Sequence, residues 1–157
     1  MESLGRKLRM CLVEASDGLR IVLFGPMDAD IGALQRSFVL LSRDCGYLQL
    51  ERQRYVAAFG GVRILLQCSV SPKGASNHAS RKGLFKNTND PFQFEWTLSA
   101  EDWDDLAAMI DGLVSSDDVG HQYLTRHPQD DATLVVSRGE YSDEILKEYD
   151  GPDSYGS

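Results

Sequence analysis

The stretch from Phe94 to Val114 reads FEWTLSAEDWDDLAAMIDGLV, and it specifies its local structure more completely than any other part of the chain. Phe94 and Trp96 alternate with polar neighbours, which predicts a short half-buried strand. Ser99 follows as an N-cap, with Asp102 three residues later in a variant of the capping box. The apolar residues beyond the cap recur at helical spacing: Trp103, Leu106, Ile110 and Leu113. The sequence therefore predicts a strand that leads directly into a helix over residues 99–114.

Upstream of this stretch, a second helix is predicted over residues 28–45. Asp30 is a natural N-cap, and Gly46 is a natural position for the chain to leave a helix. The apolar residues between them fall on one face of a helix: Ile31, Leu34, Phe38 and Leu41. Before this helix, residues 8–13 and 19–24 read as two strands joined at Asp17-Gly18, which predicts a β-hairpin.

The middle of the chain has the composition of a β-sheet. Residues 46–52 alternate apolar and polar side chains, as on a half-buried strand. Residues 54–59 and 62–70 are two β-prone runs separated by Gly60-Gly61. Two glycines between such runs favour a type I′ turn, because both central residues of that turn need positive φ. We therefore predict a hairpin at this position.

Residues 71–92 have the composition of turns and predict a long exposed loop. The basic residues of this loop concentrate in residues 71–86, and its first acidic residue is Asp90. Two more strands, at 121–125 and 132–137, follow the second helix. Together the elements predict an α+β domain over residues 1–143, with a largely antiparallel sheet of about five to seven strands and two main helices. Residues 144–157 read as an acidic, flexible tail.

Charge is distributed unevenly along the 157 residues, whose net charge is −8. Residues 1–86 carry 13 Lys and Arg against 7 Asp and Glu, whereas residues 87–157 carry 3 against 17. Nine acidic residues and no basic one lie between Lys86 and Arg126. An acidic field repels nucleic-acid phosphates and attracts basic proteins, so we expect no nucleic-acid partner.

The compartment is predicted from what the sequence lacks. The first residues have no apolar run of the length found in a signal peptide, and no stretch reaches the 18 or more apolar residues of a membrane span. Three widely spaced cysteines, Cys11, Cys45 and Cys68, favour reduced and mostly buried thiols over a disulfide framework. These features predict a cytoplasmic protein without membrane contact.

Signatures of common enzymes are missing from the sequence. The segment FGPMDAD after residues 19–24 has the position of a phosphate loop, but it has a single glycine, and Asp28 and Asp30 would repel an anion. No serine lies in a G-x-S-x-G elbow, and neither Cys45 nor Cys68 has a sequence context that marks a lowered pKa. We expect no cofactor and no enzymatic activity.

The segment GHQYLTRH at residues 120–127 raises one alternative. His121 and His127, with Asp130 and Asp131 close behind, suggest a metal site or an acid–base pair in a small hydrolytic enzyme. The two histidines are six residues apart, so they cannot share a helix face. Two other interpretations stay open: the segment is the first strand of a hairpin followed by a solvated turn, or the chain is a structural module whose exposed edge strands pair between copies.

The acidic helix supplies the remaining functional candidate. Its exposed face and C-terminal end carry Glu101, Asp104, Asp105, Asp111, Asp117 and Asp118. These carboxylates form either an ordinary solvated face or a docking surface for a basic protein, whose approach long-range attraction would accelerate.

A family resemblance favours the docking surface. The succession FEWTLSAEDWDDLAAMIDGLV, GHQYL and ATLVVSRGEY, within residues 92–141, resembles short acidic bacterial immunity proteins of polymorphic and contact-dependent toxin systems. The resemblance implies a protein that neutralises a basic toxin by covering its active site. It carries over no catalytic residue, and the basic loop at 71–86 departs from an all-acidic interface.

Overall fold

The computed structural model describes residues 4–69, 82–125 and 127–154. Two α-helices and nine strands make up most of this part of the chain. In chain order the elements are β1 Leu8–Ala15, β2 Gly18–Gly25, α1 Ile31–Asp44, β3 Tyr47–Gln49, the 3₁₀ turn η1 Leu50–Arg52, β4 Val56–Ala58, β5 Arg63–Cys68, β6 Gly83–Lys86, β7 Gln93–Leu98, α2 Ala100–Ser115, β8 Gly120–Tyr123, β9 Thr133–Arg138 and the 3₁₀ turn η2 Asp143–Leu146.

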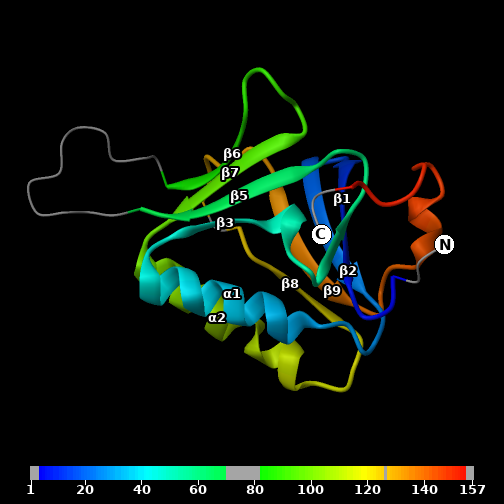
Figure 1. The fold of residues 1–157 in the computed structure, drawn as a ribbon, viewed down its shortest axis with the longest axis horizontal. Coiled ribbons are helices and arrows are strands. Elements are labelled where there is room, and N and C mark those ends of the chain that lie inside the picture. Colours follow the sequence, from blue (N-terminus) through cyan, green and yellow to red (C-terminus); the bar gives the residue numbers. More distant parts are fainter. Residues whose placement is uncertain (1–3, 70–81, 126, 155–157) are drawn as a thin grey trace, which may run out of the picture.

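The strands form two sheets (Figure 1). Sheet A has the order β4-β1-β2-β9-β8, and sheet B has the order β3-β5-β7-β6. The α+β class, the single domain and the two main helices are confirmed. The nine described strands exceed the five to seven predicted, and they divide between two sheets. Four of the seven strand pairs in the described residues are antiparallel, while β1–β4, β2–β9 and β5–β7 are parallel.

Both helices begin where their caps predicted. The Asp30 side chain accepts a hydrogen bond from the backbone N–H of Ala33, and Ser99 and Asp102 form a reciprocal capping box at α2. The end of α1 differs from the prediction. Cys45, one residue before Gly46, adopts the left-handed conformation with φ of 47° and closes the helix through its N–H to the Leu41 carbonyl.

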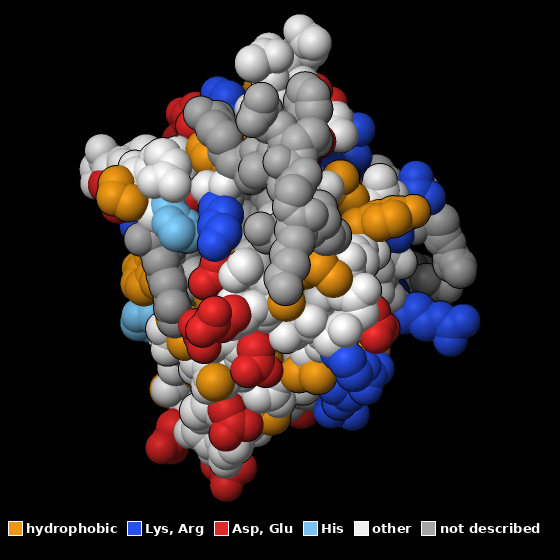
Figure 2. Space-filling model, turned by 90° about the vertical axis from the view of Figure 1, so that its left-hand side faces the viewer, with side chains coloured by type: hydrophobic (Ala, Val, Ile, Leu, Met, Phe, Trp, Pro, Cys, Tyr) orange, Lys and Arg blue, Asp and Glu red, His pale blue; other side chains and the backbone are white. Residues whose placement is uncertain are grey.

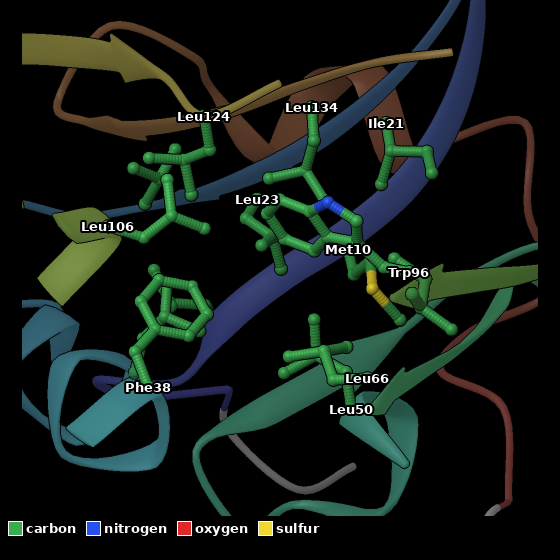
Figure 3. Packing of buried hydrophobic residues seen from close by; sticks show 14 of the residues in the cluster. Met10, Ile21, Leu23, Phe38, Leu50, Leu66, Trp96, Leu106, Leu124 and Leu134 are labelled. Carbon is green, nitrogen blue, oxygen red and sulfur yellow. The ribbon is translucent and has the colours of Figure 1, made fainter. Parts of the chain in front are cut away.

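The main core lies where the inner faces of the two sheets meet the helix pair (Figures 1 and 3). α1 and α2 pack side by side, and their buried stripes face the strands. At the centre, the ring of Trp103 lies 5.1 Å from Trp96 and 5.5 Å from Phe38, measured between centroids. The stripe predicted for residues 99–114 is therefore confirmed as buried, with Trp103 fully enclosed.

A second apolar cluster covers the outer face of sheet A. Side chains of β1, β2 and β9 meet the C-terminal segment there, including Leu146 and Tyr149. The Asp153 carboxylate accepts a hydrogen bond from the Gly61 N–H at 2.7 Å, and the Asp153 N–H donates to the Ala58 carbonyl. The prediction of a flexible tail from residue 144 is corrected accordingly: residues 143–154 pack on the sheet, because apolar side chains spaced along them complete a surface that the sheet leaves uncovered.

The hairpin predicted at Gly60-Gly61 does not form. Both glycines have positive φ, 74° and 83°, as a type I′ turn would need. However, β4 before them pairs in parallel with β1 in sheet A, and β5 after them joins sheet B. The glycines therefore mark the crossing between the sheets. Gly60 also lies against Tyr149, where a Cβ would come within 2.6 Å of the ring.

Two further predictions need correction. All three cysteines were predicted to be reduced and mostly buried, but Cys45 and Cys68 form a disulfide, with Cα atoms 4.9 Å apart. Cys11 is a buried free thiol, as predicted. The pairing arises because the end of α1 returns to the end of β5, a contact between residues 23 apart in the sequence. Residues 83–86 of the predicted basic loop are strand β6, and residues 70–81 lie outside the described residues.

Candidate functional site

The acidic residues predicted on the exposed face and at the C-terminal end of the second helix are exposed. Each of the six carboxylate residues has an exposed side chain: Glu101, Asp104, Asp105, Asp111, Asp117 and Asp118. The first four lie on α2, and the last two lie in the turn that leads to β8. Figure 2 views the molecule from the end where α2 begins, and Asp and Glu side chains gather in the lower half of that face. We call these six residues the acidic surface.

Four of the six carboxylates are carried by a helix that packs tightly against the core. The opposite face of α2 is buried in the core, and the Trp103 indole N–H donates to the Gln67 carbonyl on β5 at 3.1 Å. Gln35 of α1 bridges the two helices by donating to the Ala107 carbonyl at 2.9 Å and to the Asp111 carboxylate at 3.1 Å. A helix held in this way presents its carboxylates in fixed positions, which lowers the entropy lost when a partner binds them.

Little positive charge from the described residues offsets these carboxylates. None of the six forms an ion pair with another residue in the described part of the chain. Lys82 approaches only the capping residue Asp102, at 3.8 Å, and Arg138 donates to the backbone carbonyl of Asp118. Glu101 lies one turn from Asp104 and Asp105, so neighbouring carboxylates repel one another across the helix face. A cation brought by another molecule would relieve that repulsion.

The histidines and aspartates of residues 120–131 do not converge on one site. His121 and Tyr123 share the outer face of sheet A, as expected for a strand, with ring centroids 5.5 Å apart. The His121 Nδ1 atom lies 2.6 Å from a carboxylate oxygen of Glu140, a residue that sequence reasoning missed. Glu140 lies two residues beyond the end of β9, whose antiparallel pairing with β8 brings it to His121. Only that register could have revealed the pair.

Asp130 and Asp131 instead hold strand β6 against the connection between β8 and β9. Asp130 accepts hydrogen bonds from the backbone N–H groups of Leu84 at 2.8 Å and His127 at 3.0 Å, and Asp131 accepts from Lys86 at 2.8 Å. The carboxylates thus accept hydrogen bonds from the backbone of a strand that pairs only with β7 in the described part of the chain. Their lone pairs are directed at protein donors and not toward either histidine ring.

Replacing Asp130 tests this structural role. In Asp130→Ala two backbone donors lose their acceptor, so the free energy of unfolding should fall by about 2 kcal/mol. Urea denaturation followed by circular dichroism measures the loss. Asp150→Ala, at an exposed carboxylate, is the matched control and should change stability by less than about 0.5 kcal/mol. Equal stability of the two variants would contradict the assignment.

The cysteines offer no activated nucleophile among the described residues. Burial, with a smaller contribution from the Glu148 carboxylate, raises the pKa of the Cys11 thiol to about 11. The thiol therefore stays protonated near neutral pH, and a protonated thiol is a poor nucleophile. Cys45 and Cys68 are joined to each other. No group of three or more His, Cys, Asp or Glu side chains is arranged to hold a metal ion in the described ranges.

Comparison with known proteins gives no information about function. No protein family, curated protein or solved structure matches the chain. The likeness to immunity proteins stays a prediction. Among the described helices, none has the length and apolar character needed to cross a membrane.

Proposed function

We propose that this chain is a non-enzymatic binding domain that neutralises a basic protein, such as a toxin domain, by covering its active site. The observation that carries the proposal is the acidic surface, whose six exposed carboxylates lack ion pairs with the described residues. The fold and the charge distribution support a binding role, and the sequence resemblance suggests the kind of partner.

The proposed mechanism has two electrostatic stages. A basic partner is first attracted over several ångströms by the summed negative field, which raises the association rate and is screened by salt. Lys or Arg side chains then pair with individual carboxylates as water leaves the interface, and these pairs fix the orientation of the two proteins. Coverage of a catalytic cleft on the partner would block access of its substrate.

Charge reversal on the acidic surface tests the proposal. We expect Asp104→Lys, Asp105→Lys and Asp117→Lys together to lower the association rate constant by about 10- to 100-fold, because steering depends on the sign of the field. None of the three lies in the first helical turn, where carboxylates favour the helix dipole. The binding partner to assay is the product of the adjacent reading frame, with kinetics measured by biolayer interferometry at low and high salt.

A matched triple variant controls for the change in net charge. Glu14→Lys, Glu95→Lys and Asp150→Lys reverse three exposed carboxylates elsewhere on the protein. This control should keep most of the association rate. An equal loss in both variants would show that total charge alone matters, and failure of the neighbouring gene product to bind would remove the proposed partner.

The proposal includes a cytoplasmic location, as the sequence predicts. The Cys45–Cys68 disulfide bears on this point, since disulfides are uncommon in reducing compartments. The redox state of the pair in cells is therefore an independent test of location.

A further inference from the structure

The outer face of sheet A contains a cavity that the proposed function does not use. Its volume is about 210 Å³. Its floor is formed by two cross-strand pairs of the β1–β2 hairpin, Val13 with Arg20 and Cys11 with Val22. Its roof is the C-terminal segment, which contributes Tyr141, Ile145 and Tyr149. α2 packs in the other apolar cluster, so this cavity is separate from the acidic surface.

Most of the cavity wall is apolar. Val13, Val22 and Ile145 contribute aliphatic surface, and the two tyrosines add ring surface. Water in such a cavity finds few hydrogen-bonding partners, so an apolar molecule would displace it at low cost. The volume is several times the ~30 Å³ that one water occupies in the liquid. The cavity therefore suits a compact organic molecule with an aromatic or branched aliphatic body.

Arg20 places a positive charge with few hydrogen-bond partners in this apolar wall. Its side chain is only 24% exposed, and its Nε is buried without a hydrogen-bond partner among the described residues. Its ion-pair partner in the described residues, Asp17, is itself 67% exposed and lies 3.4 Å from Nη2, a long contact. The guanidinium also lies over the Tyr123 ring, with its central carbon 5.8 Å from the centroid. A largely buried guanidinium favours a carboxylate, which accepts two of its donors at once.

Glu148 restricts the charge of an acceptable ligand. This exposed residue also lines the cavity, and its carboxylate contributes to the raised pKa of both Cys11 and Tyr149. One cation and one anion at the same cavity permit a single negative charge next to Arg20. A second negative charge would meet Glu148 and be repelled.

We propose that this cavity binds a small monocarboxylate with an apolar body, with Arg20 as the carboxylate-binding residue. The apolar wall supplies most of the contact area, and the guanidinium selects for the acid. The C-terminal segment forms the roof, so a bound ligand would also hold that segment on the sheet.

Titration with benzoate, followed by ¹H–¹⁵N correlation spectra, tests the site. Saturable shifts should appear in β1, β2 and residues 141–149. Neutral benzamide and the dicarboxylate phthalate should each bind at least about tenfold more weakly, from loss of a charge-assisted hydrogen bond and from repulsion respectively. Arg20→Gln should weaken benzoate binding by a similar factor, whereas Arg43→Gln, at an exposed arginine on α1, should leave it unchanged.

A second variant guards against a folding defect in Arg20→Gln. Val13→Phe adds a ring to the cavity floor and should abolish benzoate binding while the rest of the spectrum stays that of the folded protein. Absence of saturable shifts in the native protein would overturn the proposal. Equal binding of benzoate and benzamide, or shifts confined to other surfaces, would do so as well. None of these outcomes depends on the acidic surface or its partner.

Discussion

Trp103→Ala lowers the free energy of unfolding by about 3–5 kcal/mol, the range for removing a buried aromatic side chain from a packed core. Trp103 is fully buried at the point where α2 meets β5, β7 and α1. The substitution removes edge-to-face contact with Trp96 and ring contact with Phe38. It also removes the hydrogen bond that the indole N–H donates to the Gln67 carbonyl. This is the largest single-residue effect that we expect.

Urea denaturation monitored by far-UV circular dichroism measures this loss. Trp103→Phe keeps much of the apolar volume and should cost less than Trp103→Ala, so the difference between the two reports on packing. Glu95→Ala, at an exposed position on β7, is the control and should stay within about 0.5 kcal/mol of the native protein. A loss below about 1 kcal/mol in Trp103→Ala would contradict the central position assigned to this residue.

Reduction of the Cys45–Cys68 disulfide gives the second large effect. The bond closes a loop spanning residues 45–68, and in the chain-entropy description such a loop restricts the unfolded state by about 3 kcal/mol. Breaking the bond should therefore lower the free energy of unfolding by a similar amount. Both cysteines are partly exposed, so a reductant can reach them in the folded protein.

Denaturation with and without dithiothreitol measures the contribution of the bond. Cys45→Ser with Cys68→Ser should match the reduced protein and should no longer respond to the reductant. Cys11→Ser is the matched control, since Cys11 is a free buried thiol, and it should keep the full response. No difference between oxidised and reduced protein would show that the bond does not constrain the chain.

The same bond tests the predicted cytoplasmic location. Rapid alkylation of thiols in intact cells, followed by mass spectrometry, reports the state of Cys45 and Cys68 before lysis. A free pair would fit a reducing compartment, and the reduced protein would then be the relevant form for stability. A stable disulfide would favour an oxidising compartment and contradict the predicted location.

Local signals predicted the helices well because helix boundaries depend on neighbouring residues. Ser99 and Asp102 satisfy the first free N–H groups of α2 within one turn, and Asp30 does the same for α1. The exposure of Glu101, Asp104 and Asp105 followed from the same helical spacing that buried Trp103 and Leu106. The two strands predicted at 121–125 and 132–137 are confirmed as β8 and β9, with bounds that differ by one or two residues.

Pairing between distant segments could not be predicted in the same way. The two glycines at 60–61 met the conformational needs of a hairpin, yet β4 pairs with β1 and β5 with β7. A turn fixes only its own dihedral angles, whereas the course of the strands depends on which distant strand each one pairs with: β4 with β1, and β5 with β3 and β7. The disulfide, the His121–Glu140 pair and the packed C-terminal segment depend on similar long-range contacts.

The sequence by itself determined the α+β class, the two helices with their N-terminal caps, and the carboxylates exposed on α2. Each of these follows from residues within one or two turns of one another, where spacing alone sets which side chains share a face. Only the tertiary structure decided the division into two sheets, the Cys45–Cys68 bond and the cavity beside Arg20. These features join residues far apart in the chain. The hydrophobic effect that brings such segments together is non-directional, so the local sequence does not specify which distant segments will pack together.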